Sequence, residues 1–286
     1  MHYFRRLGLI FVTTTFCFVT LVSAQALETP ASHAYMIDTT TGAVLLDKNG
    51  SKLMAPASMS KLMTLFMVFE RLQDGRLSLD DKFYVSEDAW RRGGTRTGGS
   101  TMFLEPAMRV RVEDLIRGII VQSGNDACIV VAEALGGSEA SFASDMTERA
   151  RDLGLMDSVF KNSTGWPDPE HRVSARDLAK LAQILAERFP EYFHYFGEKS
   201  FVFNGIKQSN RNPLIYKNMG ADGLKTGHTK ESGYGLTGTA VRKGRRLVLV
   251  VNGLASKKMR SSESQRLLEW GFREFGNYEL FKAGDI

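Results

Sequence analysis

The feature that most limits the possible fold is the order of strand-like and helix-like segments along the chain. Alternating or apolar runs that favour strands occur near both ends, at residues 34–47 and at residues 234–241 and 246–251. Each pair of runs flanks a turn-forming sequence, Thr39-Thr40-Thr41-Gly42 in the first and Lys243-Gly244 in the second. Helical periodicity fills the middle. This order predicts an α+β fold in which the two ends build an antiparallel sheet and a helical subdomain is inserted between them.

The helical middle divides at capping and turn signals. A helix is expected from Ser58 through Arg71, and further helices at residues 112–121, 126–135, 138–153, 174–188 and 262–275. The segment 174–188 opens with the capping-box pattern Ser174-Ala175-Arg176-Asp177. Residues 85–106 contain four glycines and predict a long loop, and loops of that length are usually functional or mobile.

Three short polar strings fall in order on this frame: Ser58-Met59-Ser60-Lys61, Ser123-Gly124-Asn125 and Lys225-Thr226-Gly227. Each string is weak alone, because its residue types are common. On a helix, Ser58 and Lys61 share one face, so the amine can reach the hydroxyl. A serine needs a base to become a nucleophile, and a lysine is a base only when burial or a second cation lowers its pKa. Lys225 is a candidate for that cation, and the strings together predict a serine acyl-transfer site.

The second and third strings are expected to complete the walls of one cleft. Ser123-Gly124-Asn125 lies in the turn between two predicted helices, where side chains can point into a cleft, although the same residues are ordinary turn formers. Lys225-Thr226-Gly227 is expected on a strand along the cleft. Its glycine would let an extended substrate approach and pair with the strand edge.

These motifs and their surroundings resemble the low-molecular-mass penicillin-binding proteins, which are the D-alanyl-D-alanine carboxypeptidases of peptidoglycan. The resemblance is carried by residues 56–64, Pro-Ala-Ser-Met-Ser-Lys-Leu-Met-Thr, and residues 222–229, Asp-Gly-Leu-Lys-Thr-Gly-His-Thr, and extends from about Ala34 to the end. It implies a three-layer α/β/α domain of the serine β-lactamase and DD-peptidase kind.

The resemblance also implies a role for each motif residue. Ser58 would attack the carbonyl of the terminal D-Ala-D-Ala bond of a peptidoglycan stem peptide, with Lys61 or Lys225 as the neutral amine. Ser123 would relay the proton to the leaving amine. Asn125 would bind the substrate amide, and Lys225 is also expected to bind substrate. The backbone N–H groups of His228 and Ser58 would form the oxyanion hole. Arg260, with Thr226 or Thr229, would bind the terminal carboxylate. β-Lactams would acylate the same serine as covalent inhibitors.

Three other functions share features with this interpretation. A DD-endopeptidase that cuts peptidoglycan crosslinks would use the same residues. A class A β-lactamase needs a further carboxylate for deacylation, and residues 162–170 offer Asp168 and Glu170. That stretch lacks the E-x-x-L-N pattern and resembles the N-x-x-G element of DD-peptidases, with Trp166 in place of the usual leucine. A non-catalytic wall-binding protein would have lost a motif residue, and none is lost.

The ends of the chain suggest how it is processed. Arg5 and Arg6, the apolar run at 7–22 and Ala24-Gln25-Ala26 predict a signal peptide over residues 1–26, with a retained anchor as the alternative. Residues 27–275 would form the catalytic domain, and residues 276–286 resemble the start of the β-rich second domain of larger family members. We therefore expect an exported enzyme of the periplasm or the outer face of the bacterial inner membrane. Membrane contact is expected only if a C-terminal anchor exists outside this chain.

Composition excludes several other classes of function. Removing residues 1–26 lowers the formal net charge from +5 to +3, and the chain has no basic run interleaved with aromatic residues, so no nucleic acid is expected. Cys128 alone remains after cleavage, so no intramolecular disulfide can form, and a buried inert thiol is expected. His33, His171 and His194 lack metal-ligand spacing, and no phosphate-binding loop is present, so neither a metal nor a cofactor is expected.

Overall fold

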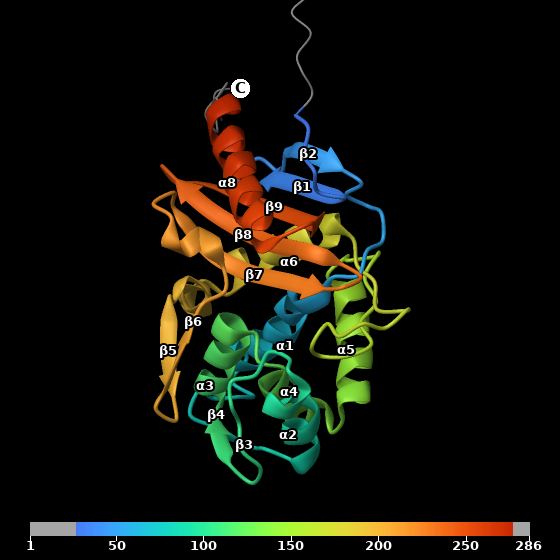
Figure 1. The fold of residues 1–286 in the computed structure, drawn as a ribbon, viewed down its shortest axis with the longest axis vertical. Helices are drawn as coiled ribbons and strands as arrows, with labels where there is room; N and C mark the ends of the chain where they lie inside the picture. The colour runs from blue at the N-terminus through green and yellow to red at the C-terminus, as the bar shows by residue number, and fades with distance from the viewer. Residues whose placement is uncertain (1–26, 277–286) are drawn as a thin grey trace, which may run out of the picture.

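The computed structural model describes residues 27–276, and its central element is a five-stranded antiparallel sheet with the order β2-β1-β9-β8-β7 (Figure 1). Its strands are β1 (His33–Asp38), β2 (Val44–Lys48), β7 (Ala221–Thr229), β8 (Gly233–Arg242) and β9 (Arg245–Leu254). Strand β1 pairs with β9 over six residues, so the first hairpin lies beside the last. The prediction of a sheet built from both ends of the chain is confirmed.

The two faces of the sheet bury alternate residues of each strand, as strand geometry requires. On β9, Leu247, Leu249 and Val251 belong to one hydrophobic cluster, whereas Val248 and Val250 belong to the other. Helix α8 (Lys257–Glu274) covers the face that carries Leu247, Leu249 and Val251. Helix α6 (Ala175–Arg188) and the other helices cover the face that carries Val248 and Val250 (Figure 1). Helices therefore cover both faces of the sheet, in the three-layer arrangement expected.

The remaining helices form a subdomain below one side of the sheet. They are α1 (Lys61–Gln73), α2 (Glu87–Gly93), α3 (Val112–Arg117), α4 (Asn125–Gly136), α5 (Glu139–Asp152) and α7 (Pro190–Phe193), with a 3₁₀ turn η1 at Ala57–Ser60 directly before α1. Two short two-stranded antiparallel sheets lie at its edge, β3 (Lys82–Tyr84) with β4 (Arg109–Arg111) and β5 (Ser200–Phe203) with β6 (Ile206–Ser209), of which only the second is a hairpin.

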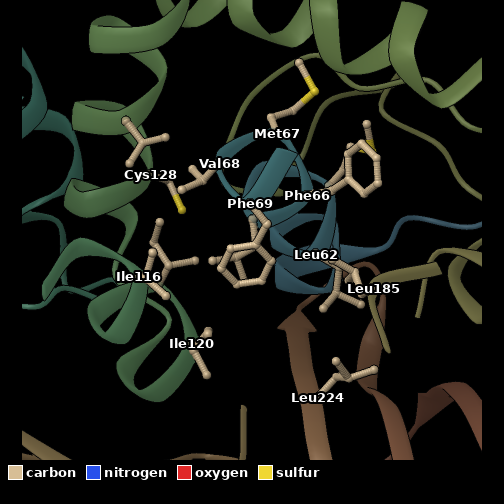
Figure 2. Packing of buried hydrophobic residues seen from close by; sticks show 14 of the residues in the cluster. Leu62, Phe66, Met67, Val68, Phe69, Ile116, Ile120, Cys128, Leu185 and Leu224 are labelled. Atoms are coloured by element: carbon tan, nitrogen blue, oxygen red, sulfur yellow. The ribbon is translucent and has the colours of Figure 1, made fainter. Parts of the chain in front are cut away.

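Helix α1 is the centre of this subdomain. Every residue from Lys61 to Phe69 is buried, and α1 contacts α4, α5 and α6. Figure 2 shows Phe66, Val68 and Phe69 pointing outward from α1 in different directions, toward residues of the surrounding elements. A helix enclosed on all sides has little rotational freedom in a close-packed interior. Any side chain at its first turn is therefore held in a defined position.

The structure corrects four of the predicted boundaries. Residues 85–106 are not one loop, because they contain α2, which is capped by the Ser86 side chain, and a 3₁₀ turn at Thr95–Thr97. The helix predicted over 112–121 is α-helical only as far as Arg117, and a π-turn follows at Gly118–Gln122. The helix predicted from Ser58 starts as η1 and becomes α-helical at Lys61. The closing helix begins at Lys257 because Ser256 caps it, so Arg260 lies inside it and not before it.

Other predictions at the level of local structure are confirmed. Ser174 caps α6 by accepting the N–H of Asp177 at 3.0 Å. The Lys225 string lies on β7, and Cys128 is fully buried, which raises the pKa of its thiol to about 12. The predicted signal peptide and residues 277–286 lie outside the described residues, and within residues 27–276 no helix combines the length and apolarity needed to cross a bilayer.

Candidate active site

A cleft of about 530 Å³ opens between η1, the π-turn, the edge strand β7 and the start of α8. Five of the eight predicted site residues line it: Ser58, Ser123, Thr226, His228 and Arg260. The other three, Lys61, Asn125 and Lys225, are buried around it. The remaining lining residues are Ser100, Arg211, Gly227, Tyr234 and Lys257. The three strings, far apart in the sequence, meet at this cleft.

The amine of Lys61 is the best-connected group beside the cleft. Its Nζ lies 3.0 Å from Ser58 Oγ, 2.8 Å from Asn125 Oδ1 and 2.6 Å from the carbonyl oxygen of Thr164. The side chain is 0 % exposed. Lysine therefore reaches serine across the i, i+3 spacing that the sequence predicted, even though the two residues straddle a 3₁₀ turn and an α-helix.

These three contacts define what a neutral Lys61 can do. A neutral amine has two hydrogens and one lone pair. The oxygens of Asn125 and Thr164 are carbonyl acceptors with no hydrogen to give, so they take both N–H groups. The lone pair is then left for Ser58, whose hydroxyl hydrogen can point at it. In this arrangement, Lys61 is placed to remove the proton of Ser58.

The surroundings make that neutral form easier to reach. Burial is the main reason that the pKa of Lys61 falls from 10.5 to about 8, Cys128, Asp126 and Glu139 oppose the fall, and the charge of Arg211 adds to it. Lys225 is also fully buried, and burial together with the charge of Lys61 lowers its pKa well below the usual range. Two amines in one dry site cannot both carry a charge easily.

Ser123 is held in a strained backbone conformation. The π-turn ends with Ser123 at φ 63° and ψ 34°, in the left-handed region, and Gly124 donates its N–H back to Gly118 at 2.9 Å. The Oγ of Ser123 is buried and has no hydrogen-bond partner within residues 27–276. Asn125 is fixed next to it by donating its N–H to the carbonyl of Ser100 at 2.8 Å.

The lining of the cleft is positively charged. Arg260 is only 7 % exposed, and its Nε lacks a hydrogen-bond partner among the described residues. Its guanidinium lies 5.8 Å from the ring centre of Tyr234, which stacks on His228 at 3.9 Å. Arg211 and Lys257 add two further cations, and no acidic residue is found in the described lining. The cleft therefore suits an anionic group.

The comparisons with known proteins agree with this geometry. The family model for D-alanyl-D-alanine carboxypeptidase, Peptidase_S11, matches residues 20–256. The chain belongs to the D-alanyl-D-alanine carboxypeptidase family. A relative from Salmonella typhimurium, D-alanyl-D-alanine carboxypeptidase DacD, is 41 % identical over 251 residues, which cover 87 % of this chain and 64 % of the relative. The chain therefore spans slightly less than two thirds of the length of that relative.

Solved structures give the same assignment for the fold. The D-alanyl-D-alanine carboxypeptidase DacD from Francisella tularensis superposes with a TM-score of 0.86 at 31 % identity, covering 90 % of this chain and 74 % of that one. Penicillin binding protein 6B from Escherichia coli superposes with a TM-score of 0.85 at 40 % identity, covering 92 % of this chain and 84 % of that one. The predicted DD-peptidase fold is confirmed for this family member.

The structure bears on two alternatives left open by the sequence: which threonine accompanies Arg260, and whether a carboxylate could activate a deacylating water. Thr226 lines the cleft together with Arg260, whereas Thr229 bonds to Ser232 and does not line it. Glu170 pairs with Lys161 at 2.8 Å, and its side chain is 72 % exposed. Neither Asp168 nor Glu170 lines the cleft, so neither occupies the place that a carboxylate needs to activate a deacylating water.

Sequence reasoning missed several groups that the fold of this family member brings to the site. Arg211, Tyr234 and Lys257 line the cleft without belonging to any motif. The Thr164 carbonyl is a backbone group, which no side-chain pattern can reveal. Residues 27–276 contain no group of three or more His, Cys, Asp or Glu side chains arranged to hold a metal ion.

Gly165, next to Thr164, sets the distance between the 3₁₀ turn η1 and the loop at 162–166. The side-chain Oδ1 of Asn162 accepts the N–H groups of Thr164, Gly165 and Trp166 at 3.2, 2.7 and 3.1 Å. Gly165 has φ +81°, and a Cβ there would collide with the carbonyl of Ala57, directly before Ser58.

We predict that Gly165→Ala lowers the melting temperature and also perturbs Ser58, because the new methyl group must push the two segments apart. The matched control is Gly205→Ala, which has a similar φ of +74° but nothing within 4 Å of the added Cβ. That control should lose only about 1 kcal/mol from backbone strain. Equal losses of unfolding free energy in the two variants, measured by urea denaturation, would contradict the close approach.

Proposed function

We propose that this chain is a serine-type D-Ala-D-Ala carboxypeptidase that removes the terminal D-alanine from peptidoglycan stem pentapeptides through an acyl-enzyme on Ser58. One observation carries the proposal: the lone pair of a buried Lys61 is left for the Ser58 hydroxyl, beside a cleft whose lining carries three cationic side chains and, among the described residues, no acidic one. Family membership and the named relatives support the same reaction.

The first half of the reaction uses the helical wall of the cleft. Lys61 takes the proton of Ser58 as its oxygen attacks the carbonyl carbon of the penultimate D-alanine. The negative charge on the carbonyl oxygen is stabilised by backbone N–H groups of Ser58 and His228, as the family resemblance implies. Asn125 holds the substrate amide, and its oxygen also holds Lys61.

The second half releases the terminal residue. The C–N bond breaks, and the D-alanine amine takes a proton through Ser123, whose Oγ has no competing partner among the described residues. Lys225 is also fully buried beside the cleft, where it would assist the proton relay. Arg260 and Thr226 hold the terminal carboxylate. Water then hydrolyses the ester of Ser58, and the enzyme is regenerated.

The site and the sequence together support further parts of the proposal. β-Lactams carry a carboxylate and a reactive carbonyl, so they fit the same two ends of the cleft and would acylate Ser58. Residues 1–26 would be an export signal, residues 27–275 the catalytic domain, and the working place the periplasm or the outer face of the inner membrane. The start of a second domain at residues 276–286 belongs to the same proposal.

We predict that a fluorescent penicillin labels the wild type and that Ser58→Ala abolishes labelling, because only this hydroxyl lies beside the Lys61 amine. Ser262→Ala, at an exposed serine outside the cleft, should label normally. Mass spectrometry locates the adduct. Incubation with a stem pentapeptide should release one D-alanine, whereas cleavage of a crosslinked dimer in preference to the pentapeptide would mean a DD-endopeptidase, and rapid penicillin turnover a β-lactamase.

We predict that penicillin acylation rises with pH and levels off above about pH 8. Protonation removes the lone pair of Lys61, so below its pKa of about 8 the rate should fall about tenfold per pH unit. A lysine with an ordinary pKa of 10.5 would place the midpoint more than two units higher. Second-order rate constants from about pH 5 to about pH 11 test this, and a flat profile would contradict a neutral Lys61 as base.

We predict that Arg260→Gln lowers kcat/KM about 10- to 100-fold for a peptide ending in a free carboxylate, the effect of losing a charge-assisted hydrogen bond. The matched control is the same peptide with a C-terminal amide, for which wild type and variant should have similar kcat/KM. An equal loss with both peptides would mean that Arg260 acts on the fold of the cleft and does not bind the carboxylate.

A further inference from the structure

His171 is a buried histidine that does not line the cleft. It is 1 % exposed and packs edge-on against Phe160, with ring centres 5.5 Å apart. Its Nε2 lies 2.8 Å from the Oγ of Ser60, which stands between Ser58 and Lys61 in the first motif. His171 therefore contacts the first motif, although neither His171 nor Ser60 lines the cleft.

The hydrogen bonds of His171 determine where its proton lies. Its Nδ1 accepts the backbone N–H of Lys161 at 3.3 Å, so Nδ1 cannot carry a hydrogen of its own. The proton of the neutral ring is then on Nε2, which donates to the Oγ of Ser60. The bond has a defined direction, from the loop at 160–173 to the start of α1.

This bond is one of three that join the first turn of α1 to that loop. Lys61 donates to the carbonyl of Thr164 at 2.6 Å, and Thr64 donates to the carbonyl of Ser163 at 2.7 Å. The bond from His171 to Ser60 holds the residue between Ser58 and Lys61, and both of its side chains are buried. Together the three bonds fix the rotation of the turn about the helix axis and its distance from the loop.

We propose that His171 is a positioning residue: by holding Ser60, it orients the first turn of α1 so that the lone pair of Lys61 points at Ser58. The proposal rests on the carboxypeptidase function proposed above. The amine of Lys61 must satisfy three partners at 2.6–3.0 Å at once, so a small rotation of the turn breaks at least one contact. Misplacement of a catalytic group by about 1 Å can reduce a rate about 100-fold.

Burial of His171 keeps this bond intact during the reaction, because it keeps the ring neutral. Burial is the main reason that the pKa of His171 falls to about 4, with Arg172 and Lys61 lowering it and Asp168 opposing them. The ring therefore stays neutral across the pH range in which Lys61 loses its proton. His171 does not itself gain or lose a proton in the reaction.

The test compares penicillin acylation of the full chain in His171→Phe, Ser60→Ala and the double variant. We expect each single variant to acylate about tenfold more slowly at pH 8, and the double variant to be no slower than either single variant. The midpoint of the pH profile should rise, because a loosened turn admits water and relieves the burial that lowers the pKa of Lys61. His171→Gln, which keeps an N–H donor, should stay within about threefold of wild type.

A matched control separates positioning from stability. Ser158 is another buried serine whose Oγ bonds to a side chain, that of Asp177 at 2.8 Å, away from the cleft. Ser158→Ala should lower the melting temperature while its acylation rate and pH midpoint remain those of wild type. If His171→Phe fails to fold, Ser60→Ala and His171→Gln carry the test, since neither adds volume to the packed interior.

The outcomes are distinguishable from failure of the proposed function. A wild type that is not acylated at Ser58 would overturn the carboxypeptidase proposal itself. A wild type that is acylated, with folded Ser60→Ala and His171 variants that match its rate and pH midpoint, would overturn the positioning role alone. Effects of the two single substitutions that multiply in the double variant would also overturn it, because they would then act independently.

Discussion

The enclosure of one lysine amine is the constraint on which the rest of this structure depends. An ammonium group is costly to remove from water, and this cost is what lowers the pKa of Lys61. The amine is nevertheless retained in the interior because two carbonyl oxygens and one hydroxyl receive it. The residues that supply these oxygens come from η1, α4 and the loop at 162–166, so three separate parts of the chain must be in place at once.

The hydrophobic core supports this arrangement directly. Lys61 begins α1, and the following turns of the same helix carry the large apolar side chains at the centre of the subdomain (Figure 2). On the opposite wall, β7 approaches η1 so closely that a Cβ at Gly227 would lie 2.8 Å from the carbonyl of Pro56. A larger residue would push the strand away from the nucleophile. The same close packing that stabilises the protein therefore also sets the distances between the residues of the site.

The sequence predicted the fold, and the residues that it predicted for the site gather at one cleft, because both leave local signals. Strand alternation, turn residues and the capping serine at 174 are short-range features, and each was found where predicted. Groups without a local signal were missed. Arg211 follows the short hairpin β5–β6 and reaches the cleft only through the tertiary fold. His171 lies 111 residues from Ser60, and no periodicity links two positions so far apart. The start of α8 was placed too late because Ser256 was not identified as its cap.

The charge of the cleft has a consequence for how partners arrive. Arg211, Lys257 and Arg260 line it, and no acidic side chain in the described lining offsets them. Such a concave, one-signed surface concentrates anions before contact and raises the rate of encounter, an effect that acts over about 10 Å at moderate ionic strength. Diffusing molecules that carry a carboxylate are therefore attracted toward the cleft. Added salt slows this capture while leaving the subsequent bond-making steps untouched.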